Sequence, residues 1–178
     1  RMIEQYWNNK KSVVFATSIA HAEAIRDDLQ GRKIEASIIH SKMVSEEQDM
    51  HLKDFVNHRS DIIINVGILT MGWDCPSVEK LFIARCTQSA ELYCQMFGRG
   101  TRVLPGVIDG IATPEGRKQA IANSDKPCFE VYDITDSSRH NSIQTALDVL
   151  TSELKPSVRK AVQQRTENET VSSEQLDA

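Results

Sequence analysis

The chain has 178 residues, enough for one domain with a sizeable core and short for two. Hydrophobic residues make up 40% of it and charged residues 26%, the balance of a soluble globular protein, and no apolar stretch approaches the roughly 20 residues of a membrane-spanning helix. The formal net charge of −4 argues against a free-standing nucleic-acid binder, whose domain would normally be basic, but it leaves room for a local phosphate-binding patch.

The ends of the chain and its cysteines bear on location and on metal binding. No basic-then-apolar segment opens the sequence, so we expect a cytoplasmic protein. A first residue other than methionine suggests either a piece of a longer polypeptide or a remnant of cloning. The cysteines form no C-x-x-C pair and no histidine pair completes a zinc pattern, so we expect reduced thiols and no metal site. These cysteines are Cys75, Cys86, Cys94 and Cys128.

The apolar pattern predicts strands that alternate with helices. In chain order we expect a weak lead-in helix at 2–8, a strand at 12–16, a helix ending at 31, a strand at 34–39, a helix at 45–56, strands at 61–66 and 78–84, a helix from 89 through 97, a short helix at 115–122, a strand at 129–134 and a helix at 143–150. The strand at 61–66 is the plainest, because it is apolar nearly throughout, as suits a parallel strand covered on both faces.

Capping residues support the second and third of these helices. Ser18 is a typical N-cap residue, and Gly31 is well placed to end the helix that follows it. Ser45 with Gln48 three residues later forms a capping box ahead of the third helix. The apolar stripe of the third helix is Leu52, Phe55 and Val56.

Strands alternating with helices of about ten residues predict βαβ units with right-handed crossovers. The fold class is therefore α/β, a parallel sheet with helices on both faces, in a single domain at 11–155 that follows a lead-in helix or linker at 1–10. Prolines and glycines break the pattern between 103 and 127 and predict a long loop, functional or mobile. Residues 156–178 have no aromatic and little apolar content, so we expect a tail that is a frayed helix or disordered.

The segment from Gln95 to Arg102 is the richest in chemistry. A helix would place Gln95, Arg99 and Arg102 on one face, because they are spaced i, i+4 and i+7. Guanidinium groups fit phosphate oxygens through paired hydrogen bonds, and the flanking glycines let a ligand come close, so this segment suits a polyphosphate. The alternative is a pair of surface arginines on a solvated helix end.

The segment from Asn65 to Pro76 follows the plainest strand, and open parallel sheets bind ligands beyond the carboxyl ends of their strands. Its two glycines, Gly67 and Gly72, allow a tight path. Asp74 could accept hydrogen bonds from a ribose hydroxyl, and Thr70 could reach a phosphate. The alternative is an ordinary connection between strands around a packed tryptophan.

Two further strand ends carry hydroxyl groups. Thr17 and Ser18 follow the first strand, and His40 with Ser41 follows the second. Hydroxyls and backbone N–H groups at helix N-termini can bind phosphate. The alternative interpretations are a plain N-cap for Ser18 and a surface histidine for His40.

Taken in this order, the segments resemble the second RecA-like domain of superfamily 2 helicases and translocases over about residues 11–135. Gln95 to Arg102 matches motif VI of that family, Q-x-x-G-R-x-x-R, at every fixed position, and Asn65 to Pro76 resembles its motif V. Residues 12–18 look like motif IV, and the stretch from His40 to Phe55 resembles the family's H-G segment. The form N-x-G-x-L-T-x-G-x-D-x-P looks closest to the helicases of the type I and III restriction and phage DNA-repair groups.

The resemblance implies a role for each candidate. Arg99 and Arg102 would be arginine fingers on the γ-phosphate of ATP, which would be bound with Mg²⁺ mainly by an N-terminal RecA-like domain of the same polypeptide. Gln95 would couple that contact to domain closure. Gly72 would lie near the bound nucleotide, and Asp74 near its ribose or at the interface between the domains. The nucleic-acid groove, for DNA in preference to RNA, would be lined by Thr17, Ser18, His40, Ser41 and Thr70.

Two positions depart from the family's pattern. Ser41 stands where the family often has glycine after the histidine. Val66 stands where motif V is expected to have a threonine, so the nucleic-acid contact of that threonine must be lost or moved to Asn65 or Thr70.

The sequence lacks the parts that would hold the nucleotide. It contains no G-x-x-x-x-G-K-[ST] loop and no Asp-Glu pair after a strand, so it cannot assemble a phosphoryl-transfer site by itself. We therefore expect the C-terminal motor domain of an ATP-dependent DNA helicase or translocase, inactive as an ATPase in isolation. A non-catalytic RecA-like scaffold or regulatory module is the alternative. A self-sufficient enzyme of Rossmann type is disfavoured, because no G-x-G-x-x-G follows the first strand.

Overall fold

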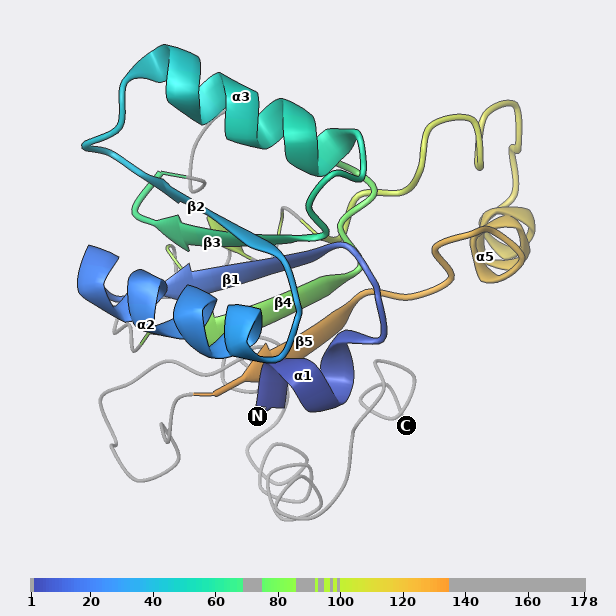
Figure 1. Ribbon diagram of the computed structural model, residues 1–178. Coiled ribbons are helices and arrows are strands. Elements are labelled where there is room, and N and C mark those ends of the chain that lie inside the picture. The colour runs from blue at the N-terminus through green and yellow to red at the C-terminus, as the bar shows by residue number, and fades with distance from the viewer. Residues whose placement is uncertain are drawn as a thin grey trace.

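The computed structural model describes residues 2–68, 75–85, 92, 95, 96, 98 and 100–134 (Figure 1). Its elements in chain order are α1 (Met2–Trp7), β1 (Ser12–Ala16), α2 (Ile19–Gly31), β2 (Ala36–His40), α3 (Ser45–Val56), β3 (Ile62–Val66), β4 (Lys80–Ala84), α5 (Pro114–Ala122) and β5 (Glu130–Asp133). The predicted helix at 143–150 and the tail at 156–178 lie outside the described residues. None of the described helices has the length and apolar character needed to cross a membrane.

The five strands form one parallel sheet in the order β2-β3-β1-β4-β5, which confirms the predicted fold class. Val14 of β1 lies opposite Ile64 of β3 and Phe82 of β4, so the strands are aligned closely and their carboxyl ends share one edge. β1 has the predicted bounds. β2 begins two residues later than predicted, because the N–H of Ile34 still donates to the carbonyl of Leu29 and closes α2.

Each face of the sheet carries a separate apolar cluster, because successive strand side chains point to opposite faces. On one face the strand residues pack with Phe55 of α3 and with Met96. On the other they pack with Ile3 of α1 and with Ala22 and Leu29 of α2. Figure 1 shows α3 on one side of the sheet and α1 and α2 on the other, which confirms helices on both faces.

The caps of the helices follow the prediction only in part. Ser18 caps α2 through its side chain, as predicted. The capping box at Ser45 is wrong: Val44 is the N-cap residue and makes no side-chain cap, because α3 already includes Ser45. The amide of Gln48 instead donates to the carbonyls of His40 and Met43, at 3.3 and 2.9 Å, and holds the turn before α3.

Two smaller details of these helices also differ from prediction. Val56 was assigned to the apolar stripe of α3 but is 48% exposed, at the end of that helix. Gly31 is the last residue of α2, yet the left-handed turn that follows the helix falls on Lys33, with a φ of 62°.

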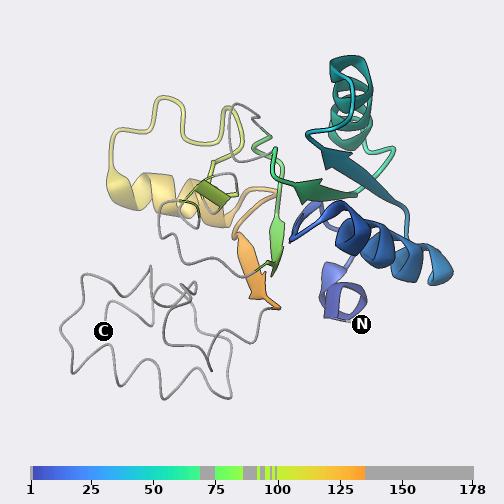
Figure 2. The same ribbon diagram turned by 90° about the vertical axis from the view of Figure 1, so that its left-hand side faces the viewer.

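The predicted short helix in the loop region is confirmed as α5. Thr113 caps it by accepting a hydrogen bond from the N–H of Gly116 at 3.2 Å. Residues 101–113 contain neither helix nor strand. Figure 2 shows α5 on the β5 side of the sheet, away from α2 and α3, and in Figure 1 it stands beyond the amino ends of the strands.

Candidate nucleotide and nucleic-acid interface

The carboxyl edge of the sheet brings two of the predicted segments near each other. Phe15 of β1 and Ile39 of β2 both pair with Asn65 of β3, so the residues after β1 and β2 flank the end of β3. Thr17, Ser18 and Ser41 are exposed there, and His40 is half-buried. This edge therefore offers hydroxyl groups to solvent from two strands, as predicted.

At the end of β1 the two hydroxyl residues are organised by a histidine that the sequence analysis did not single out. The Oγ of Ser18 accepts a hydrogen bond from the N–H of His21 at 3.2 Å, so the N-cap interpretation of Ser18 is confirmed. The Oγ1 of Thr17 lies 2.9 Å from Nδ1 of His21. The i, i+4 spacing of Thr17 and His21 was the available signal for this contact.

At the end of β2 the main chain is fixed more firmly than the side chain. The carbonyl of His40 accepts from the N–H of Met43 at 3.1 Å and from the Gln48 amide. Nδ1 of His40 is buried and has no hydrogen-bond partner within the described part of the chain. The turn that carries Ser41 is thus held by main-chain contacts, which leaves the Ser41 side chain exposed.

The segment Asn65–Pro76, which starts at the end of β3, begins with a tight turn, as predicted from Gly67. The side-chain oxygen of the buried Asn65 accepts from the N–H of Ile68 at 3.1 Å, and Gly67 has a φ of +78°, which favours glycine. The predicted site residues Thr70, Gly72 and Asp74 lie outside the described residues.

The segment Gln95–Arg102 is anchored in the core through Met96. Leu92, Gln95, Met96 and Gly98 have helical backbone, as predicted. Met96 is fully buried in the cluster that also holds Phe55, whereas Gln95 is half-buried and Arg102 is exposed. Arg99 lies outside the described residues.

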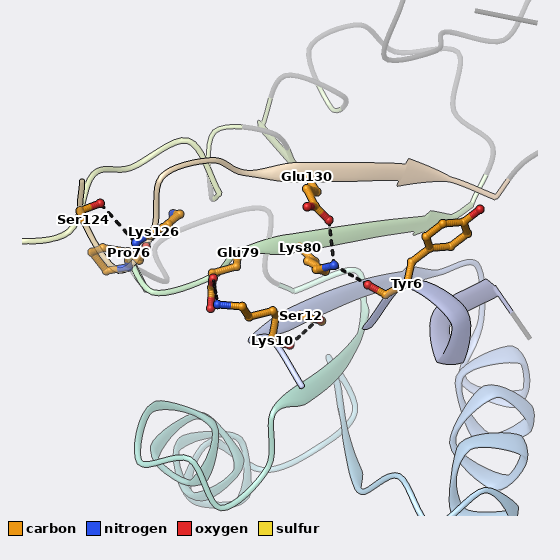
Figure 3. Close-up of polar contacts among 9 residues, drawn as sticks. All are labelled: Tyr6, Lys10, Ser12, Pro76, Glu79, Lys80, Ser124, Lys126 and Glu130. Carbon is orange, nitrogen blue, oxygen red and sulfur yellow. Dashed lines mark hydrogen bonds and ion pairs between the residues drawn. The ribbon is translucent and has the colours of Figure 1, made fainter. Parts of the chain in front are cut away.

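The main chain at the end of this segment lies at the amino ends of the strands. Nζ of Lys126, ahead of β5, donates to the carbonyls of Gly100 and Arg102. It also donates to the carbonyl of Pro76, which precedes β4 (Figure 3). Gly100 and Arg102 therefore lie at the opposite edge of the sheet from Thr17, Ser18, His40 and Ser41.

The buried Lys80 near this end of the sheet is paired with a carboxylate. Nζ of Lys80 lies 2.8 Å from the Glu130 carboxylate and also donates to the Tyr6 carbonyl (Figure 3). Burial of the Glu130 carboxyl opposes its ionisation, but the hydrogen bonds from Lys80 and Tyr132 outweigh that effect and hold the pKa of Glu130 below its usual range. Burial lowers the pKa of Lys126, which is 7% exposed.

Metal ligands are not grouped in the described ranges. No cluster there of three or more His, Cys, Asp or Glu side chains could hold a metal ion. Cys75 is buried with its Sγ 3.2 Å from the Ser77 hydroxyl, and Cys128 is exposed, both as free thiols. The described residues thus do not fit a Mg²⁺ site.

Known proteins share this fold and sequence pattern. Residues 1–103 match the family described as "Helicase conserved C-terminal domain". The putative ATP-dependent helicase IRC3 of Saccharomyces cerevisiae is 29% identical over 94 residues, 53% of this chain and 14% of that protein. The type I restriction enzyme EcoKI endonuclease subunit of Escherichia coli is 28% identical over 111 residues, 56% of this chain and 10% of that protein.

A solved structure extends the likeness to the fold. S. cerevisiae Dbp5 bound to RNA and ADP BeF3 has a TM-score of 0.56 at 20% identity, over 76% of this chain and 31% of that chain. The chain spans well under a third of the curated relatives named above, 14% and 10% of their lengths. The family match nevertheless covers more than half of the 178 residues, so the chain belongs to the helicase conserved C-terminal domain family.

Proposed function

We propose that this chain is the C-terminal motor domain of an ATP-dependent DNA helicase or translocase and supplies arginine fingers to ATP bound by an N-terminal RecA-like domain. The observation that carries the proposal is the contrast within the segment Gln95–Arg102. Met96 is fully buried in its own lobe, whereas Arg102 is exposed. An arginine carried by an anchored segment and exposed at its end is suited to a ligand that lies outside the lobe.

A guanidinium in that position suits phosphoryl transfer. Charge spreads over the oxygens of the transferred γ-phosphoryl group, and a fixed, always-charged donor stabilises it. Arg99 and Arg102 would gain charge-assisted hydrogen bonds only when the two lobes close on ATP. Hydrolysis removes that gain, so the lobes would open again. Gln95 would couple the contact to closure, and Gly72 and Asp74 would lie near the nucleotide. Mg²⁺ would be held by the other lobe.

The nucleic acid would lie across the carboxyl edge of the sheet. Thr17 and Ser41 present exposed hydroxyls from the two strand ends that flank β3, a pattern that suits phosphate contacts and not base reading. Ser18, His40 and Thr70 would complete this groove, Ser18 through the N-terminus that it caps. Dbp5 was solved with RNA, and the restriction-type form of Asn65–Pro76 together with the EcoKI relative favours DNA here.

The experiment compares ATP hydrolysis by this chain alone with hydrolysis by the full-length polypeptide, each with single-stranded DNA, duplex DNA or RNA. We expect no hydrolysis by the chain alone and DNA-stimulated hydrolysis by the full-length protein. DNA-dependent hydrolysis by the isolated chain would contradict the proposal, and stimulation by RNA alone would overturn the assignment to DNA. A full-length protein with no turnover would instead indicate the scaffold.

A further inference from the structure

Lys126 joins two segments that the proposed motor uses. Its Nζ donates to the carbonyl oxygens of Pro76 at 2.7 Å, Gly100 at 2.6 Å and Arg102 at 2.9 Å. An ammonium group has three N–H donors, so these contacts use all of them, and hydrogen bonds from a charged donor are about twice as strong as neutral ones. One buried side chain thereby ties the exit of the Asn65–Pro76 segment to the end of the arginine segment.

The neighbours of Lys126 hold its ammonium in place. The main-chain N–H of Lys126 donates to the Ser124 hydroxyl at 3.2 Å (Figure 3). That hydroxyl donates to the carbonyl of Ile121 at the end of α5. Nζ also lies 5.7 Å from the centre of the Phe129 ring, a cation–π distance. The Ser124 and Phe129 contacts, both from residues just ahead of β5, therefore help to hold the ammonium in place beside the three carbonyls.

The Phe129 ring packs against the same main chain at Gly100. Gly100 is buried, and a Cβ atom built on it would lie 1.7 Å from Cε2 of Phe129. Only glycine fits at that distance. The main chain from Gly100 to Arg102 is thus contacted by both Phe129 and Lys126, although the Arg102 side chain is exposed.

We propose that Lys126 is a positioning residue for phosphoryl transfer: by binding the carbonyls of Gly100 and Arg102 it sets where the Arg102 guanidinium meets the nucleotide. The inference rests on the proposed function of Arg102. A displacement of about 1 Å in a positioned group can cost about 10²-fold in rate, so removing the ammonium should slow turnover without touching ATP.

The test uses the full-length polypeptide, with ATP as the titrated ligand and saturating DNA. Lys126→Met removes the three donors and keeps a chain of similar length. Lys126→Arg keeps the charge, but a planar guanidinium cannot direct three donors to the same three oxygens. The matched control is Lys11→Met, since Lys11 is 4% exposed, donates to the carbonyl of Val56 at 2.6 Å and lies 5.4 Å from the Phe55 ring.

For Lys126→Met we expect kcat to fall about 10- to 100-fold while the KM for ATP stays within about twofold. Lys126→Arg should have an intermediate kcat. Lys11→Met should lower the thermal midpoint, as Lys126→Met does, but keep the wild-type kcat. In the double variant with Arg102→Ala, Lys126→Met should cause no further loss, because both changes remove one interaction.

Two results would overturn the inference. One is a kcat of Lys126→Met equal to that of Lys11→Met, and the other is a full additional loss in the double variant. If Lys126→Met shows no cooperative unfolding transition, it is not folded, and Lys126→Arg becomes the test variant. A wild-type kcat for Lys126→Arg then counts against the inference. A wild-type kcat for Arg102→Ala by itself refutes the proposed function instead, so the two failures are distinguishable.

Discussion

Replacing Gly100 by alanine should destabilise the domain because of a single close contact. The new Cβ would lie 1.7, 1.9 and 2.4 Å from three atoms of the Phe129 ring, where ordinary contacts exceed 3.4 Å. The half-buried ring packs against the core cluster of Phe55 and Met96, so a shift of more than 1 Å would disturb that packing. Overpacking of this kind costs about 1–3 kcal/mol. In a domain of this size that lowers the thermal midpoint by about 2–12 °C.

Gly98 provides the matched control two residues earlier. It is helical and exposed, and a Cβ there would meet no atom within 4 Å. Gly98→Ala should therefore raise stability by about 0.4–1 kcal/mol. Thermal unfolding of both variants and of Gly100→Ala with Phe129→Leu is the assay, and the smaller side chain should recover part of the loss. Gly100→Ala with wild-type stability would refute the close packing that holds the arginine segment.

Two further predictions concern stability. Ser18→Ala should cost about 0.5–2 kcal/mol, since the hydroxyl caps α2, whereas Ser45→Ala should cost little, since its side chain caps nothing; denaturant unfolding compares them, and equal losses would contradict the assignment of the caps. Glu130 has a pKa lowered from 4.5 in the folded state, so its contribution to stability is present above that value and is lost as the pH falls through the lower folded pKa. Glu130→Gln should thus reduce stability at neutral pH and make stability fall less steeply as the pH is lowered. Thermal unfolding at a series of pH values measures this, and the same acid dependence in the variant as in the wild type would count against the pairing with Lys80.

The strands were predictable because each is a short apolar run whose residues fill both faces of the sheet, as the bounds of β1 illustrate. Local patterns were less reliable where tertiary contacts compete for the same atoms. Ser45 and Gln48 have the spacing of a capping box, yet Gln48 binds carbonyls in the preceding turn. Ile34 has the apolar character of a strand residue, yet its N–H closes α2.

The candidate site divides in the same way. The sequence showed the hydroxyl residues after the strands and the spacing of the arginines, because both features depend on side-chain type and position. Lys126 was not, because its three partners are main-chain carbonyls 50, 26 and 24 residues away, and a carbonyl has no sequence signature. The position of Gly100 and Arg102 at the amino ends of the strands was likewise not predictable, because it follows from their contacts with Lys126.

The central claim is that Arg102 contacts a nucleotide held by another lobe, and single-turnover ATP hydrolysis by the full-length Arg102→Ala variant tests it most directly. Arg26→Ala is the control, since Arg26 is a surface arginine on α2 paired with Asp27. We expect the rate of ATP hydrolysis to fall about 10³-fold or more in Arg102→Ala, and we expect Arg102→Lys not to restore it. The Arg26→Ala control should keep the wild-type rate. Hydrolysis by Arg102→Ala at the rate of the Arg26 control, in a folded protein, would contradict the central claim.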